Sequence, residues 1–126
     1  MTQEELQTIL EKHKKWLNNV PGGERANLER ANLRCANLER ANLEGANLKG
    51  ANLDYSCWPL WCGSLRNVRI DKRIFAQLAY HICRVIVDDD DECKAAQRAL
   101  YPIANQFHRV DECGRLPLEG SESYDD

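Results

Sequence analysis

A five-residue repeat dominates the first half of the chain. Between residues 25 and 55 the tripeptide Ala-Asn-Leu begins six times at intervals of five, at Ala26, Ala31, Ala36, Ala41, Ala46 and Ala51. An α-helix turns by about 100° per residue, so this spacing would spread the leucines around every face. A flat strand would send alternate leucines to opposite faces, because its side chains alternate with a period of two. Neither regular element buries all six leucines together.

A backbone that turns a corner every five residues does bury them together. Each leucine and the alanine two residues before it then point inward, while the asparagine and the two variable residues face solvent. Asparagine suits such corners because its side chain bonds to nearby backbone and tolerates turn dihedrals. Gly45 and Gly50 fit the same demand. The alternative is a helical or disordered low-complexity segment, since Ala, Leu, Glu and Arg favour helix. An asparagine at every fifth position argues against it.

The motif Ala-Asn-Leu-X-X resembles the signature of the pentapeptide-repeat family over residues 25–55, and more loosely over 56–70. The resemblance implies a mainly β solenoid with α caps: a short right-handed quadrilateral β-helix of about two coils. Four pentapeptides complete one coil in that fold, so residues twenty apart would stack. The core would then be formed by the side chains of Leu28, Leu33, Leu38, Leu43, Leu48, Leu53 and Trp58.

We expect a single domain over residues 1–126. It would comprise an N-terminal capping helix (1–20), the repeat (21–70), two C-terminal helices (71–110) and a flexible acidic tail (111–126). The first helix is predicted by a capping-box pattern at Thr2 and Glu5 and by an apolar face. A solenoid exposes apolar residues and unpaired backbone at its ends, so this helix is interpreted as a cap.

The repeat degrades after Tyr55. Leu60, Leu65 and Ile70 keep the spacing of five but are shifted by two residues from the earlier leucines. The shift predicts a bulged last coil. Trp58 and Trp61 would either fill the extra volume or stand exposed as interface anchors, and both readings stay open.

The C-terminal third predicts two helices. The first spans Asp71–Val87, with Asp71 as its N-cap and apolar residues at helical spacing. The second spans Glu92–Val110, is preceded by acidic residues that stabilise a helix N-terminus, and is kinked or restarted at Pro102. Its apolar residues Leu100, Ile103, Ala104, Phe107 and Val110 would pack against the first. Gly114 is expected to end the ordered structure, with a mobile segment over Glu119–Asp126.

Charge is unevenly distributed along the chain. Residues 1–55 are neutral, residues 56–85 carry five basic and one acidic side chain, and residues 86–126 carry four basic and eleven acidic ones. A partner would contact the outward arginines of the repeat and the basic segment after it. These candidate binding residues are Arg30, Arg34, Arg40, Arg66, Arg69, Lys72 and Arg73.

No catalytic constellation or cofactor motif is recognisable, so we expect no enzyme activity and no cofactor. The histidines lie on predicted helices without a partner at motif spacing. Cys57, Cys62, His81 and Cys83 could supply four zinc ligands, but their spacing is not that of a zinc knuckle, and no metal site is expected. The chain has neither a long apolar run nor a signal peptide, so we expect no membrane association and a cytoplasmic location, in which its six cysteines stay reduced.

The layout of short helix, brief repeat, Cys-Trp-Pro-Leu-Trp-Cys-Gly-Ser-Leu segment and two helices resembles small pentapeptide-repeat proteins of phages and prophages. The resemblance implies a protein–protein interaction module that inhibits a bacterial host protein, such as a CRISPR–Cas defence complex. One alternative is a DNA mimic that binds gyrase, which needs many coils and an acidic face. A second is weak nucleic-acid binding at Arg66–Arg73, opposed by the acidic C-terminal third. A homodimer through an uncovered coil end stays open.

Overall fold

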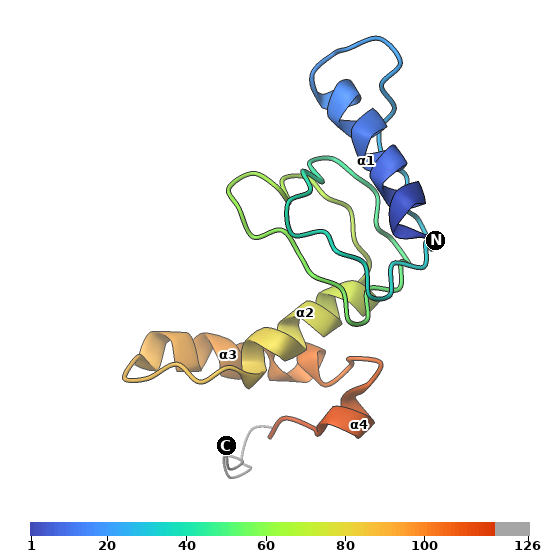
Figure 1. Ribbon diagram of the computed structural model, residues 1–126. Helices are drawn as coiled ribbons and strands as arrows, with labels where there is room; N and C mark the ends of the chain where they lie inside the picture. Colours follow the sequence, from blue (N-terminus) through green and yellow to red (C-terminus); the bar gives the residue numbers. More distant parts are fainter. Residues whose placement is uncertain (118–126) are drawn as a thin grey trace. The chain divides into compact units, whose positions relative to one another are not determined.

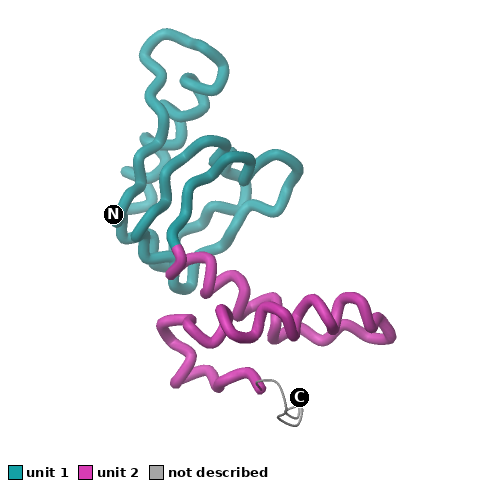
Figure 2. The backbone as a smooth tube through the Cα atoms, turned by 180° about the vertical axis from the view of Figure 1, so that it is seen from behind, with its two compact units in different colours: residues 1–71 teal, residues 72–126 magenta. Residues whose placement is uncertain are grey.

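The computed structural model describes residues 1–117, which form two compact units, residues 1–71 and the part from residue 72 onward (Figure 2). We describe each unit by itself, and the single domain expected for residues 1–126 stays a prediction. The described residues contain four helices (Figure 1): α1 (Gln3–Leu17), α2 (Lys72–Arg84), α3 (Asp91–Ala104) and α4 (Val110–Cys113).

The predicted fold class, a mainly β solenoid, is wrong. Residues 1–117 contain no β-strand, and their regular secondary structure is helical. The β pairing in these residues is limited to four isolated parallel bridges: Asn27–Asn47, Asn32–Asn52, Asn37–Cys57 and Asn47–Arg69. The reason is the short period of the repeat. A turn every five residues leaves single paired positions between turns, well below the usual strand length of about five residues.

The backbone of the repeat nevertheless returns beside itself after twenty residues. The N–H of Leu28 donates to the carbonyl of Asn47 at 2.8 Å, and the N–H of Leu33 donates to that of Asn52 at 2.9 Å. We call residues 26–45 the first pass of the backbone and residues 46–67 the second pass. All six repeat leucines point inward, and none is more than 4% exposed. Trp58, expected among them, is only half-buried, and its indole N–H donates to Ser56 Oγ at 3.1 Å.

Asparagine fixes the corners of the repeat. In all six copies its Oδ1 accepts the backbone N–H two residues later, at 3.0–3.2 Å. The fifth residue of a copy usually has a positive φ: 59° at Arg30, 63° at Cys35 and 61° at Tyr55, with glycine at two further corners. Arg40 is not among the positive-φ residues, so its corner is built differently.

Two extra residues enter the second pass between Cys57 and Ser64, as the shifted spacing predicts. Up to that point bridged residues are twenty apart, whereas Asn47 pairs with Arg69, twenty-two residues later. The side chain that fills the core here is Pro59, which is fully buried. Trp61 is 44% exposed, so the reading in which it fills the bulge is wrong.

Helix α1 begins with the predicted capping box. Thr2 Oγ1 accepts the Glu5 N–H at 3.1 Å, and Glu5 Oε1 accepts the Thr2 N–H at 3.2 Å. The hydrogen bond from the Thr2 backbone lowers the pKa of the Glu5 carboxyl. Helix α1 lies beside the repeat within the first unit (Figure 1), and its buried side chains are Leu6 and His13.

In the second unit α2 packs against α3. The buried cluster joins Ala79, Tyr80 and Cys83 with residues 104–116, and the predicted Leu100 and Ile103 pack on its margin. The expected core face of the helix Asp71–Val87 is only partly right, because several of its apolar side chains are exposed: Phe75, Leu78 and Ile82 in α2, and Val85 and Ile86 beyond its end at Arg84. Ala79 belongs to the buried cluster, and its small side chain permits close helix packing.

The predicted helix Glu92–Val110 is divided. Helix α3 ends at Ala104, two residues after Pro102, which has no N–H for the helical hydrogen-bond pattern. The expected end of order at Gly114 is also wrong. Asn105 bonds to both backbone groups of Leu116, at 2.8 and 3.0 Å, and Leu116 is 2% exposed. The expected mobile segment Glu119–Asp126 lies outside the described residues.

Candidate protein-binding site

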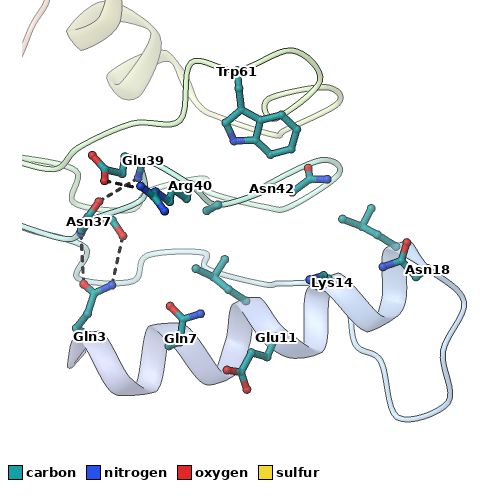
Figure 3. Close-up of a pocket in the computed structure, with 13 residues that line it drawn as sticks. Gln3, Gln7, Glu11, Lys14, Asn18, Asn37, Glu39, Arg40, Asn42 and Trp61 are labelled. Carbon is teal, nitrogen blue, oxygen red and sulfur yellow. Dashed lines mark hydrogen bonds and ion pairs between the residues drawn. The ribbon is translucent and has the colours of Figure 1, made fainter.

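A groove of about 750 Å³ lies between α1 and the edge of the first pass (Figure 3). It lies within the first unit and mixes apolar, carboxamide and charged groups. Its lining from α1 and the residue after it is Gln3, Gln7, Leu10, Glu11, Lys14, Leu17 and Asn18. The facing lining is Asn37, Glu39, Arg40, Ala41, Asn42 and Trp61.

Gln3 closes one end of the groove. Its Oε1 accepts the backbone N–H of Asn37, and its Nε2 donates to the Asn37 carbonyl, both at 3.3 Å. A neighbouring strand would satisfy the same two backbone groups in the same way. The carboxamide of Gln3 therefore takes the place of a peptide group at this corner, as Figure 3 shows.

His13 holds α1 against the repeat. Its side chain is fully buried, its Nδ1 accepts the Ala26 N–H at 2.9 Å, and its Nε2 lies 2.9 Å from the Glu44 carbonyl. An acceptor at Nδ1 and a donor at Nε2 require the neutral imidazole with its proton on Nε2. Burial lowers the pKa of His13 below its ordinary value. The sequence reasoning missed this role, although His13 lies seven residues after the buried Leu6 and so shares its helix face.

Trp61 forms the wall of the groove away from α1 (Figure 3). Two residues inserted into the second pass place it there. Ser64 anchors the inserted segment, because its Oγ lies 2.9 Å from the Pro59 carbonyl and 2.7 Å from the Trp61 carbonyl. The backbone of this loop is thus held in place while the indole stays 44% exposed.

Of the predicted binding residues, Arg40 alone lines the groove. Its side chain is 94% exposed and lies 4.0 Å from Glu39, a contact of little energetic value at the surface. The guanidinium of Arg34 lies 5.0 Å above the ring of Tyr55, and Arg66 lies 3.4 Å from Glu44.

The remaining predicted binding residues are exposed in their own units: Arg30 and Arg69 in the first, Lys72 and Arg73 in the second. Their role in binding stays a prediction.

Within residues 1–117, no group of three or more His, Cys, Asp or Glu side chains is placed to hold a metal ion. Of the four candidate zinc ligands, Cys57 and Cys62 are exposed thiols, and burial raises the pKa of Cys83. His81 is exposed and its ring contacts Phe107 at 5.5 Å. None of the helices described has the length and apolar character needed to cross a membrane.

Residues 24–55 match the family model of pentapeptide repeats, with eight copies. This segment of the chain is a run of pentapeptide repeats. Pentapeptide repeats generally act as protein-interaction modules and are generally non-catalytic. No curated protein and no solved structure matched the chain. The matched residues include one wall of the groove, whereas α1 and Trp61 lie outside the match.

Proposed function

We propose that this pentapeptide-repeat protein is non-enzymatic and binds another protein through the groove and the adjoining face of the repeat. The observation that carries the proposal is the exposed indole of Trp61 in a groove with carboxamide and charged groups around it. Tryptophan is enriched among the residues that dominate binding energy at protein interfaces. A ring of polar groups around such an anchor is the usual anatomy of an interface.

The frame behind the groove supports this role. Six asparagine side chains fix the corners, and six buried leucines fill the interior. A surface with fixed geometry loses little conformational entropy when a partner binds. The pair of Arg34 and Tyr55 adds a second anchor of a type common at interfaces, because Tyr55 remains 63% exposed beneath the guanidinium.

For the partner we propose a bacterial host protein or complex, met in the cytoplasm, with the chain acting as a phage-derived inhibitor of a defence system of the CRISPR–Cas type. The support for this is the resemblance of its layout to small phage proteins. Gyrase inhibition by DNA mimicry is less favoured, because the repeat is neutral over residues 21–55 and short. Nucleic-acid binding is less favoured because the chain has a net charge of −3.

The test is an affinity capture from bacterial lysate with wild-type protein and matched variants. Trp61→Ala removes the anchor, whereas Leu60→Ala changes a neighbour that is 89% exposed and does not line the groove. We expect a partner that Trp61→Ala loses and Leu60→Ala keeps. Equal capture by both variants would contradict the groove as the site.

A second comparison tests the repeat face. Simultaneous reversal of Arg30, Arg34 and Arg40 to Glu is expected to weaken capture without unfolding the chain. These side chains belong to exposed residues, so circular dichroism should show an unchanged fold. Capture unaffected by this triple variant would exclude the repeat arginines. Recovery of gyrase, or of nucleic acid that salt removes, would favour the corresponding alternative instead.

A further inference from the structure

At the corner of Asn42 the pairing of the first pass with the second is incomplete: the N–H of Leu43 donates to Ser64, but within residues 1–117 no N–H donates to the carbonyl of Ala41. Asn27, Asn32 and Asn37 each form a bridge to the second pass, and Asn42 forms none. The two residues inserted before Ser64 account for this, because they shift the facing segment out of register. Arg40, two residues earlier, also lacks the positive φ of the other corners. Asn42 lines the groove.

The backbone of Asn42 presents an unpaired donor and acceptor at this corner. Within residues 1–117, neither its N–H nor its carbonyl has a hydrogen-bond partner, while its side chain accepts the Glu44 N–H at 3.0 Å. The next N–H, that of Leu43, donates toward the second pass, to Ser64. In extended backbone successive N–H groups point in opposite directions. The amide of Asn42 is therefore directed away from the second pass, toward the side on which α1 lies.

The corner at Asn37 shows what such a pair of groups accepts. There the N–H of Leu38 donates to Cys57 in the second pass, while the N–H and carbonyl of Asn37 bond to the carboxamide of Gln3. The corner at Asn42 has the same arrangement: the N–H of Leu43 donates to the second pass, and the N–H and carbonyl of Asn42 form no bond to it within residues 1–117. At Asn37 the chain supplies its own peptide-like group, and at Asn42 the equivalent position is unfilled by any described residue.

We infer that the groove binds an extended segment of the partner protein, which pairs its backbone with the N–H and carbonyl of Asn42. The inference rests on the proposed function. An extended segment carries a free donor and acceptor on the same residue, whereas an α-helix uses these groups internally. Adding a strand-like segment to an unpaired edge is a common mode of peptide recognition.

The lining of the groove specifies the side chains of that segment. Leu10, Leu17 and Trp61 offer apolar contact, which suits one or two apolar side chains. The charges in the lining are balanced, with Glu11 and Glu39 against Lys14 and Arg40. A segment with no net charge therefore fits better than a strongly acidic or basic one.

The test uses a displayed library of uncharged peptides of about eight residues, selected on the full chain and counter-selected on Trp61→Ala. Selected peptides are remade with one backbone nitrogen methylated at a time, which removes a donor and keeps every side chain. We expect one position at which methylation weakens binding at least tenfold. We also expect slower hydrogen exchange of the Asn42 amide in the complex, with no change at Asn32. The Asn32 backbone also lacks a partner among residues 1–117 but lies outside the groove, so it serves as the internal control.

Failure to enrich any peptide, tolerance of methylation at every position, or an unchanged Asn42 amide would each overturn the inference. Different results would refute the proposed function and the inference. A lysate partner that depends on Trp61, combined with peptides that tolerate every methylation, refutes only backbone pairing at Asn42. A partner that is indifferent to Trp61→Ala refutes the groove itself.

Discussion

The substitution His13→Phe tests whether one imidazole holds α1 to the repeat. His13 is fully buried, and it bonds to the backbone at Ala26 and at Glu44, two positions separated by about 60 Å of fully extended chain. Phenylalanine keeps the ring volume and the contact with Trp16, where the ring centroids lie 5.5 Å apart. It removes both hydrogen bonds. The change therefore separates the effect of the two hydrogen bonds on stability from the effect of packing.

The expected loss of stability follows from the two backbone groups that lose their hydrogen-bond partner. A buried backbone donor or acceptor without a partner costs about 1–3 kcal/mol, so the N–H of Ala26 and the carbonyl of Glu44 together cost about 2–6 kcal/mol. The cavity contribution is small because the ring is retained. For a unit of this size each kcal/mol lowers the midpoint of thermal unfolding by about 4–8 °C. We expect a drop of at least about 8 °C at neutral pH.

The same histidine predicts a pH dependence. Its pKa is lowered in the folded state, so the unfolded chain takes up the proton more readily. The stabilisation is complete above the ordinary histidine pKa of about 6.5 and is lost as the pH falls below it, by at most about 1.4 kcal/mol per pH unit. His13→Phe removes this contribution. Carboxylates with lowered pKa, such as that of Glu5, lose their contribution only at more acidic pH.

Urea unfolding followed by tryptophan fluorescence from pH 5 to 8 measures both effects. All three tryptophans, Trp16, Trp58 and Trp61, lie in the first unit, so the signal reports the part that contains His13. The control is His81→Gln, which changes an exposed histidine of the second unit. If His13→Phe were as stable as wild type with the same slope between pH 5 and 6.5, the reasoning would be refuted. If the variant did not fold, nitrogen NMR of wild-type His13 would decide, because any form other than the neutral Nε2–H tautomer contradicts the geometry.

Four further substitutions test other parts of the fold. Leu43→Ala removes a leucine with no exposed surface and should lower the free energy of unfolding by about 2–5 kcal/mol in urea titrations; a loss below 1 kcal/mol would contradict its inward position. Cys35→Gly places glycine at a position with a positive φ and should leave stability unchanged or raise it by up to about 1 kcal/mol. Arg40→Gly, at a corner without a positive φ, should lower stability by about 0.5–1 kcal/mol. If Arg40→Gly stabilised the chain and Cys35→Gly destabilised it, the assignment of the corners would be refuted. Asp90→Ala removes the cap of α3, whose Oδ1 accepts the Cys93 N–H at 2.8 Å, and should reduce helicity by circular dichroism. That hydrogen bond also lowers the pKa of Asp90, so the difference between Asp90→Ala and wild type should vanish as the pH falls through the pKa of the folded state; a difference that persisted in acid would exclude the carboxylate as its cause.

The parts of the fold that the sequence predicts are those set by local chemistry. The asparagine side chain accepts the backbone N–H two residues later, and this bond does not depend on the surroundings. The corners therefore follow from the repeat itself. The capping box at Thr2 and Glu5 is equally local. The length of pairing between corners is not local, because it depends on how the turns orient the backbone, and so the expected β class failed.

The errors at α2 and Trp61 have a different origin. Helix α2 carries apolar side chains on more than one face, so spacing alone does not select the face that meets α3. Small residues such as Ala79 determine which face of α2 packs against α3, and Ile82 is left 52% exposed. In the inserted loop the spacing reveals two extra residues but not which side chain leaves the core. The buried Pro59 and the bonds of Ser64 decide that, and they require the three-dimensional structure.

The shortness of the repeat has a consequence for how such a chain can evolve. Helix α1 lies on one side of the first pass, and Trp61 belongs to the pass that follows it. A duplication of twenty residues would preserve every inward leucine and every corner, yet it would move α1 and Trp61 apart by about 4.8 Å, the spacing of paired backbones. An insertion of five residues would carry Trp61 to a different side altogether. If the groove binds the partner as proposed, its width limits the number of repeats, and a variant with an added coil would fold but lose the site.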